Sequence, residues 1–324
     1  MTKNIFVLLF AFALGIAPRW AIATNYSFVR SIGSYGSGNG QFYFPRGIIA
    51  TSSGNIWVSD GNNERIEEFT SNGTFVRSIG QEGIVMGPEG MALTPQGDIL
   101  FGDCIGQITE YTSSGGFVQQ FGAIGNGNGQ FASSIFGITT DRSGNIWAVD
   151  TYNSRIQELT NNGTFIRAFG SIGYQNGQLT FPEDVVLDKS GNVWVADTSN
   201  SRIVEFTNTG TYVKTVGQGM LYGPSSLGFD FSGNLWVADT GNDRMVEFSS
   251  SGDIVGGFGT SGSGNGYLYR PNSFTWDSAG DMWIADGLNN RIVEYAPVPE
   301  PSTIVLLGIG ALGLLAYAGR RKTS

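Results

Sequence analysis

Apolar and polar positions repeat along this chain, with short apolar runs bounded by glycine and aspartate. One seven-residue phrase returns six times, as in Gly191-Asn-Val-Trp-Val-Ala-Asp197. Its closing aspartates lie 43, 47, 47, 42 and 47 residues apart, at Asp60, Asp103, Asp150, Asp197, Asp239 and Asp286. A period of this length accommodates four short strands with their turns and leaves no room for a helical unit. The pattern therefore predicts an all-β fold, a six-bladed β-propeller of four-stranded blades.

The remainder of each repeat also has the pattern of strands. Five of the six repeats run from the aspartate through four residues to an arginine and then alternate, as in Arg202–Phe206. This alternation indicates a strand, and a glycine turn such as 71–74 supplies the positive φ that a tight hairpin requires. We expect the segment before each phrase, such as 47–50, to be the innermost strand, beside a central channel.

The sixth repeat lacks a fourth strand, because the chain passes after Tyr295 into a proline-rich segment. The missing strand lies at the other end of the chain, where residues 25–33 read like residues 72–80. We therefore expect the N-terminal strand to pair as the outer strand of the last blade. Such a closure removes free edges from the ring.

Both ends of the chain have the composition of targeting segments. Residues 1–23 combine Lys3, an apolar run and small residues at Ala21 and Ala23, which predicts a signal peptide with a single helix. At the other end, a linker at 297–303 precedes a segment at 304–324, in which one apolar helix leads into a basic tail. That helix is close to the length needed to span a thin bilayer, and its terminal cations predict a cytoplasmic C-terminus. The propeller itself is expected at 24–296.

The tail resembles a PEP-CTERM sorting signal, because Pro299, Glu300 and Pro301 precede one apolar helix and a basic end. The resemblance implies a Gram-negative bacterium that makes exopolysaccharide, and an exosortase-type processing enzyme as a partner. It also implies that the C-terminal helix holds the protein transiently in the inner membrane, before delivery to the periplasm, the outer envelope or the exterior. An ordinary C-terminal membrane anchor is the alternative.

The repeat resembles the NHL family from about residue 25 to residue 295. The matching features are the tryptophan phrase, the link from aspartate to Arg-Ile, and a proline that opens most inner strands, namely Pro45, Pro88, Pro182, Pro224 and Pro271. The resemblance implies a propeller but no single activity, because NHL propellers include scaffolds for protein or RNA and, in one branch, a zinc-dependent lyase.

The charge of the chain argues against nucleic acid as a partner. Of 18 basic and 27 acidic residues, five basic and one acidic lie in the end segments, which leaves 13 and 26, a net charge near −13. Binding to nucleic acid depends on Lys and Arg that neutralise phosphates, so we expect no nucleic acid partner. The single Cys104 excludes an internal disulfide framework.

Most recurring residues have a structural interpretation. The tryptophans are expected to fill the wedge between neighbouring blades. The aspartates that close each phrase, and the asparagines three residues later, are expected to cap backbone NH groups and accept left-handed backbone. Glycine-rich segments such as 36–42 are interpreted as flexible connections between blades, because no helix follows them to form a phosphate site.

The chain contains no histidine, which excludes His-ligated zinc, a Ser-His-Asp triad and histidine general-base catalysis. It therefore departs from the zinc-dependent lyase branch at residues which that branch needs. We expect a non-catalytic scaffold with no metal and no cofactor. The alternative is a lactonase or hydrolase that depends on a divalent cation such as Ca²⁺, held by Asp, Glu and Asn at the channel mouth.

One position varies in every repeat while its surroundings recur. It follows the proline that opens the inner strand, a place taken by Ile135 in the third repeat, and its residues are Arg46, Glu89, Phe136, Glu183, Ser225 and Asn272. Loops on a rigid scaffold are where binding residues concentrate, so this ring is the predicted ligand site, for an envelope protein or an exopolysaccharide. Drift at a position free of packing demands is the other explanation. If the ring does not bind, the turns around Tyr152 and Leu288 are the next candidates.

Overall fold

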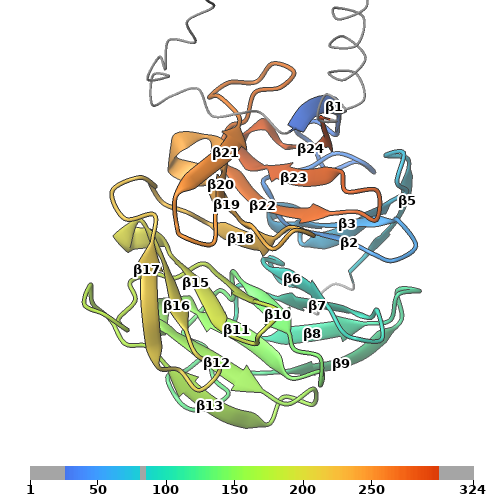
Figure 1. Ribbon diagram of the computed structural model, residues 1–324. Helices are drawn as coiled ribbons and strands as arrows, with labels where there is room; N and C mark the ends of the chain where they lie inside the picture. The colour runs from blue at the N-terminus through green and yellow to red at the C-terminus, as the bar shows by residue number, and fades with distance from the viewer. Residues whose placement is uncertain (1–25, 81–84, 299–324) are drawn as a thin grey trace, which may run out of the picture.

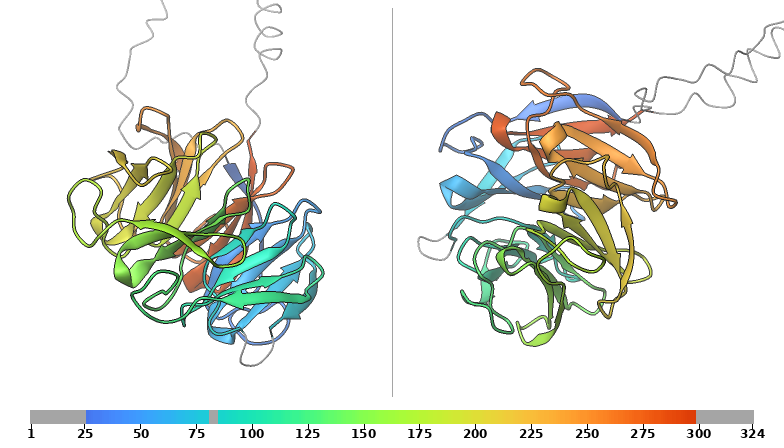
Figure 2. Two further views of the ribbon diagram at one scale, coloured as in Figure 1. Left: turned by 90° about the horizontal axis from the view of Figure 1, so that it is seen from below. Right: turned by 90° about the vertical axis from the view of Figure 1, so that its left-hand side faces the viewer.

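The computed structural model describes residues 26–80 and 85–298, which form six antiparallel sheets of four strands each. The sheets surround a central axis as blades (Figures 1 and 2). Neighbouring inner strands contact one another around the ring, and β22 contacts β2, which closes it. The predicted six-bladed propeller is therefore confirmed.

Each blade runs outward from its inner strand. Blade 1 comprises β2 (Pro45–Ala50), β3 (Ile56–Asp60), β4 (Arg65–Phe69) and β5 (Phe75–Ile79). Blade 2 comprises β6 (Met91–Leu93), β7 (Ile99–Gly102), β8 (Ile108–Tyr111) and β9 (Phe117–Phe121). Blade 3 comprises β10 (Ile138–Thr140), β11 (Ile146–Asp150), β12 (Arg155–Leu159) and β13 (Phe165–Phe169).

The second half of the ring repeats this order. Blade 4 comprises β14 (Asp184–Leu187), β15 (Val193–Asp197), β16 (Arg202–Phe206) and β17 (Tyr212–Val216). Blade 5 comprises β18 (Ser226–Phe229), β19 (Leu235–Asp239), β20 (Arg244–Phe248) and β21 (Ile254–Phe258). Blade 6 comprises β22 (Pro271–Trp276), β23 (Met282–Asp286), β24 (Arg291–Pro297) and β1 (Tyr26–Ile32). Short 3₁₀ turns follow the second strand in every blade except blade 2, at Gly61–Asn63, Thr151–Asn153, Thr198–Asn200, Thr240–Asn242 and Gly287–Asn289.

The N-terminal strand closes the last blade, as predicted. β1 pairs antiparallel with β24, in a register from Tyr26 opposite Pro297 to Ile32 opposite Ile292. The Tyr26 ring also packs edge-on against Trp236 of blade 5, with ring centroids 5.3 Å apart. The closing strand therefore stabilises one blade by hydrogen bonds and the next by packing.

The hydrophobic core lies between blades. Six clusters of buried residues occupy the six junctions, and the tryptophan of the repeated phrase belongs to one of them in every blade except blade 2, where Leu100 takes its place. The second strands are buried along their whole length, as in Val193–Asp197. The third strands, whose sequence alternates, are buried in the same way, as in Arg202–Phe206. Their alternation is therefore not one of buried and exposed faces, because neighbouring blades cover both sides of each sheet.

The aspartates of the repeated phrase accept from backbone NH groups, as expected, but in every blade except blade 2 the NH group belongs to the preceding loop and not to the turn that the aspartate opens. Asp197 is a representative case: its Oδ1 accepts from the backbone N of Thr180 (2.6 Å), and its Oδ2 accepts from Asn200 Nδ2 (2.8 Å) and Arg202 Nε (2.7 Å). The left-handed residue is the one after the asparagine, such as Ser201 with φ 52°. Each such aspartate therefore ties together two strands and the loop that precedes its blade.

The glycine-rich segments connect the blades, as predicted, and each is closed by a repeated hydrogen-bond pattern; their flexibility stays a prediction. In the first of them, the Gln41 side chain accepts from the backbone N of Gly38 (3.0 Å), and Tyr35 forms a parallel bridge with Phe42. Gln130 and Phe131 repeat these contacts in the third blade, with Gly127 N as donor (3.0 Å) and Ile124 as the bridge partner.

Within the residues that the structure describes, no helix is long and apolar enough to span a bilayer. The helices predicted in the signal peptide and in the C-terminal anchor lie outside those residues, as does the Pro299-Glu-Pro301 motif.

Candidate functional site

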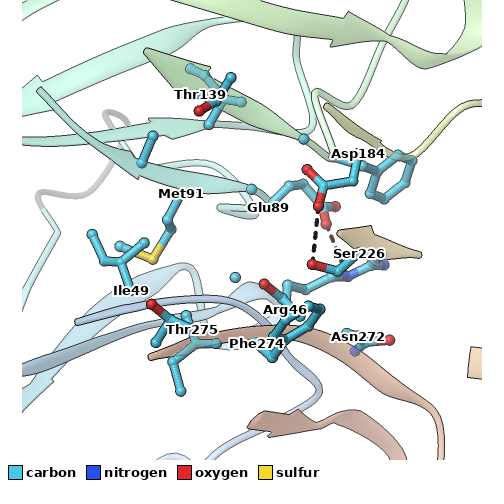
Figure 3. Close-up of a pocket in the computed structure, with 18 of the residues that line it drawn as sticks. Arg46, Ile49, Glu89, Met91, Thr139, Asp184, Ser226, Asn272, Phe274 and Thr275 are labelled. Carbon is cyan, nitrogen blue, oxygen red and sulfur yellow. Dashed lines mark hydrogen bonds and ion pairs between the residues drawn. The ribbon is translucent and has the colours of Figure 1, made fainter. Parts of the chain in front are cut away.

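The six variable residues lie together, one from each blade, around a cavity of about 210 Å³ at the axis of the propeller. Figure 3 shows Arg46, Glu89 and Asn272 directed into this space, with Ile49, Met91 and Phe274 among the apolar side chains that line it. The repeat places each residue at the start of an inner strand, so the blades bring the six positions to one end of the channel. We call this the channel mouth.

An ion pair between neighbouring blades dominates one side of the mouth. Arg46 Nε lies 3.0 Å from Glu89 Oε2, and the Arg46 guanidinium also stacks over Phe44 and Phe136, at 4.8 and 5.1 Å from their ring centres. Glu89 is almost fully buried. Burial raises the pKa of Glu89 to about 7, although the charge of Arg46 acts to lower it. Three of the predicted residues thus form one packed cluster.

A second pair of carboxyl groups, Glu183 and Asp184, lies on the wall contributed by blade 4. Burial raises the pKa of each to about 7, and Arg46 and Arg270 oppose this shift at Glu183. The Asp184 carboxylate accepts from Ser226 Oγ (3.0 Å) and from the backbone N of Leu227 (2.8 Å), both in blade 5. Asp184 therefore joins two inner strands, whereas Glu183 faces the two arginines.

Ser225 and Asn272 use their polar groups for contacts between blades. Ser225 Oγ donates to the carbonyl of Asn272 (2.8 Å), and Asn272 Nδ2 donates to the carbonyl of Pro45 (2.8 Å). These two residues join blades 5, 6 and 1 in sequence. These two side chains therefore serve to connect blades. The charged and aromatic side chains that a ligand could contact at the mouth belong to blades 1 to 4.

Glycines fix the backbone around the mouth in the first three blades. A Cβ at Gly47 would lie 2.5 Å from the carbonyl of Glu89, and one at Gly90 would lie 2.2 Å from the carbonyl of Phe136. Real Cβ atoms do not approach backbone this closely, so each glycine lets the next blade's variable residue approach. In blade 4 this position is Asp184, which instead reaches across to blade 5.

A wider depression of about 560 Å³ opens beside the channel and shares Arg46, Glu183 and Asn272 with it. Its rim adds Tyr222, which is 64% exposed, and Arg270. The residues directly before three of the prolines, Phe44, Phe181 and Arg270, have left-handed backbone with φ of 63°, 47° and 52°, and Phe44 and Arg270 line this depression. Such backbone is unfavourable for bulky residues. A large residue directly before the proline is the sequence signal that could have identified this rim.

The turns around Tyr152 and Leu288, the next candidates from sequence, lie outside both cavities. Tyr152 and Leu288 are each partly exposed, and neither lines the channel or the wider depression. The Tyr152 ring packs edge-on against Phe181 at 5.0 Å. Tyr152 is therefore not part of the mouth.

No group of three or more Cys, Asp or Glu side chains in the described part of the chain is arranged to hold a metal ion. At the mouth, the carboxylate of Glu89 pairs with Arg46 and that of Asp184 accepts three hydrogen bonds from protein groups. These two carboxylates are thus engaged by groups of the protein itself.

Comparison with known proteins identifies two sequence features and a fold. Residues 179–206 match the NHL repeat, and residues 297–322 match the PEP-CTERM protein-sorting motif. A streptogramin B lyase structure is 17% identical, with a TM-score of 0.63 over 85% of this chain and 98% of that one. A protein of unknown function from Bacteroides thetaiotaomicron is also 17% identical, with a TM-score of 0.67 over 84% of this chain and 75% of that one.

A third similar structure is virginiamycin B lyase from Staphylococcus aureus with quinupristin, in a catalytically inactive variant that has alanine in place of a histidine. It is 18% identical, with a TM-score of 0.59 over 86% of this chain and 90% of that one. At these identities the likeness concerns the fold alone. The PEP-CTERM motif indicates an exported protein and implies recognition by an exosortase-type enzyme. The chain is an NHL-repeat six-bladed β-propeller protein with a C-terminal PEP-CTERM sorting signal.

Proposed function

We propose that this protein is an exported, non-catalytic binding scaffold that captures a protein or glycan of the cell envelope or extracellular matrix at the channel mouth. The observation that carries the proposal is the convergence of the six variable residues on one cavity. The residues that recur in the repeats pack in the core or take part in the hydrogen bonds around the aspartate of the repeated phrase. The variable positions instead combine a cation, two carboxyl groups and an aromatic ring.

The chemistry of the mouth suits a polar ligand with several different contacts. Arg46 is held in place by Phe44, Phe136 and Glu89, so it is presented in one orientation, and such preorganisation favours binding. Beside it, the rim adds the aromatic rings of Tyr222 and Tyr269 and the exposed hydroxyl group of Ser199. Aromatic faces and hydroxyl groups placed together offer both stacking and hydrogen bonds.

The sorting motif supports a final location in the periplasm, in the outer envelope or outside the cell, after a stage in the inner membrane. On this proposal the exosortase-type enzyme acts on the tail, and the envelope protein or exopolysaccharide is the partner of the propeller. The alternative function is a hydrolase or lactonase that uses a divalent cation such as Ca²⁺. Metal analysis of the purified protein, with a lactone hydrolysis assay in the presence of Ca²⁺, tests this alternative.

Simultaneous alanine substitution of Arg46, Glu89, Phe136 and Glu183 tests the scaffold proposal. Removing both members of the Arg46–Glu89 pair avoids leaving one buried charge without a partner. We expect the variant to lose capture of purified exopolysaccharide, or of envelope proteins in a quantitative pull-down, while its circular dichroism spectrum is unchanged.

A matched control removes an equivalent ion pair on the outer strands, Arg167 and Glu158, whose Nε and Oε2 atoms lie 2.7 Å apart. This double alanine variant should capture normally. Undiminished capture by the folded quadruple variant would contradict the assignment of the site to the mouth and would direct attention to the turns around Tyr152 and Leu288.

A further inference from the structure

Three consecutive blades present an exposed tyrosine at one structural position beside the channel mouth. The position follows the buried apolar residue near the end of each connection between blades, and in blades 5, 6 and 1 it holds Tyr222, Tyr269 and Tyr43. Their side chains are 64, 45 and 44% exposed. Tyr222 and Tyr269 line the wider depression, and Tyr43 lines another of about 410 Å³; Arg46 lines both. We call these three residues the tyrosine arc.

The backbone holds each residue of the tyrosine arc in the same way. The backbone N of each tyrosine donates to Oδ1 of its blade's repeated aspartate, in all three cases at 2.7 Å. The next residue is left-handed, namely Phe44, Gly223 or Arg270, with φ of 63°, 56° and 52°. Its backbone N donates to a side chain of the preceding blade, namely Asn290 Oδ1 (2.9 Å), Ser201 Oγ (3.3 Å) or Asp243 Oδ1 (2.8 Å). Two blades therefore fix each segment, and only the two side-chain torsions of each tyrosine are left to order on binding.

The fold does not require tyrosine at this position. The equivalent residues of blades 2, 3 and 4 are Met86, Ala132 and Thr180. In blade 4 the backbone N of Thr180 donates to Asp197 Oδ1 at 2.6 Å, and Phe181 follows with a φ of 47°. A threonine thus takes the same backbone conformation and makes the same hydrogen bond. Exposed aromatic rings that the backbone does not need, set among polar groups, are typical of a ligand-binding surface.

The surroundings of the tyrosine arc favour a sugar over a protein segment. In the part of the chain that the structure describes, no Val, Leu, Ile or Met side chain lines either depression. The centre of a protein interface is instead apolar and poor in charge. The C–H face of a pyranose ring meets the negative face of an aromatic ring favourably, and its hydroxyl groups can pair with exposed polar side chains such as Asn62, Ser199 and Arg270.

The charges around the tyrosine arc favour an uncharged sugar chain. In the depression between Tyr222 and Tyr269, two arginines face two carboxyl groups, namely Arg46 and Arg270 with Glu183 and Asp243. In the depression beside Tyr43, Arg46 is accompanied by Glu64 and Glu89. Cations therefore do not outnumber carboxyl groups in either depression, and a net charge near −13 on the whole propeller repels a polyanion.

We propose that the tyrosine arc binds a neutral polysaccharide, with pyranose rings stacked on the tyrosines of blades 5, 6 and 1 and hydroxyl groups paired with the polar side chains of the two depressions. This inference rests on the proposed function and narrows its ligand from protein or glycan to an uncharged glycan.

Calorimetric titration of the exported protein with neutral hexasaccharides of glucose, mannose and galactose tests the proposal, with a hexauronate as the charged probe. We expect at least one neutral hexasaccharide to bind, and more tightly than its disaccharide or the hexauronate. Threonine at Tyr43, Tyr222 and Tyr269 together should weaken this binding at least about tenfold, or about 1.4 kcal/mol, without unfolding the blades, because blade 4 already has threonine there. The triple phenylalanine variant keeps the rings and should retain binding, and alanine at Met86 and Thr180 should have no effect.

A second measurement reports on the tyrosines directly. The bound hexasaccharide should protect the tyrosine arc from nitration by tetranitromethane, read by peptide mass spectrometry. Tyr174 is the internal reference, because it is 73% exposed and lines neither depression. Failure of every neutral hexasaccharide to bind, tighter binding of the hexauronate, unchanged affinity in the threonine variant, or nitration unaffected by the sugar would each overturn the proposal.

Parallel titration of the quadruple alanine variant of the mouth separates this inference from the proposed function. Loss of binding in the threonine variant alone would support the tyrosine arc and contradict the mouth as the capture site. Loss in the quadruple variant alone would overturn the tyrosine arc and support the mouth. Loss in both would support one glycan that spans the two. Capture of an envelope protein with no glycan binding would overturn this inference and leave the proposed function standing.

Discussion

Asp103 in blade 2 should respond to substitution in the opposite way from its counterparts in the other blades. Its Oδ1 accepts from the backbone N of Ile105 (3.0 Å) and of Gln107 (2.8 Å), but its Oδ2 is buried without a hydrogen-bond partner. In the other blades, an asparagine and an arginine donate hydrogen bonds to the equivalent aspartate. In blade 2 these two positions are Gly106 and Ile108. Burial raises the pKa of Asp103 from 3.8 to about 6.

The sign and size of the effect follow from this pKa. Because the folded-state pKa lies above the unfolded value, the native state binds the proton more tightly, and this contribution to stability is fully present below about pH 4. It is lost as the pH rises through about 6. A difference of about two pKa units corresponds to roughly 3 kcal/mol. The Asp103→Asn variant has no charge at this site, so it should gain about 3 kcal/mol relative to the wild type between about pH 4 and pH 8.

Asp150→Asn is the matched comparison in blade 3. Asp150 Oδ1 accepts from Ala132 N (3.0 Å), and Oδ2 accepts from Arg155 Nε (2.7 Å) and Gln157 Nε2 (3.1 Å). Since both oxygens face donors, the amide NH₂ of asparagine would meet a donor in either orientation. Breaking a buried pair costs about 3 to 5 kcal/mol, and we expect the low end because Arg155 keeps carbonyl partners at Gly127 and Gln130.

Guanidinium chloride unfolding of the wild type and both variants, at acidic and at mildly alkaline pH, measures these differences. Asp150→Asn should be less stable than the wild type throughout, with a melting temperature lower by roughly 6 to 12 °C at mildly alkaline pH. Asp103→Asn should be as stable as the wild type or more stable at that pH. If both variants lose stability equally at alkaline pH, or if the Asp103→Asn difference does not change with pH, the reasoning from the unpartnered oxygen is wrong.

Three further predictions concern closure, sorting and the mouth. Deleting residues 25–33 removes the strand paired with β24 and should lower the melting temperature or cause aggregation; an unchanged melting curve would contradict the closing role. Alanine at Pro299, Glu300 and Pro301 should leave the protein membrane-bound with its tail uncut, and an identical mature C-terminus by mass spectrometry in wild type and variant would refute this. Gly90→Ala places a Cβ against the carbonyl of Phe136 and should lower the melting temperature. Gly97→Ala is the control, because its Cβ would meet open space and only its φ of 90° is unfavourable. Equal losses of melting temperature in the two variants would contradict the crowding at Gly90.

The sequence predicted the fold well because each blade is a local unit. The repeat period and the phrase that ends in aspartate fix the number of blades, and the likeness of residues 25–33 to residues 72–80 identifies the closing strand. The same register predicted that Arg46, Glu89, Phe136 and Glu183 share one position, so the ring symmetry brings them together. Whether they bind a ligand stays a prediction.

Contacts between blades could not be predicted in the same way. At the position after the variable residue, three repeats have glycine and three have Asp184, Ser226 or Ser273. Only the three-dimensional structure shows that Asp184 accepts from Ser226 and Leu227 of the next blade. Periodicity within a repeat identifies the strands, but not which side chains of the next repeat lie against them.

The channel mouth is chemically one-sided, and this bears on what it can capture. Ser225 and Asn272 donate to backbone carbonyls across the junctions of blades 5, 6 and 1, so that arc of the ring has little polar capacity left for a ligand. The opposite arc presents Arg46, Glu89 and Glu183, with pKa values of about 7 for the two carboxyl groups. In a symmetric ring, a ligand centred on the propeller axis would meet the same group from every blade. This ring does not offer the same group from every blade. The arrangement instead favours an asymmetric ligand that lies across the arc of blades 1 to 4 and extends over the rim toward Arg270 and Tyr222.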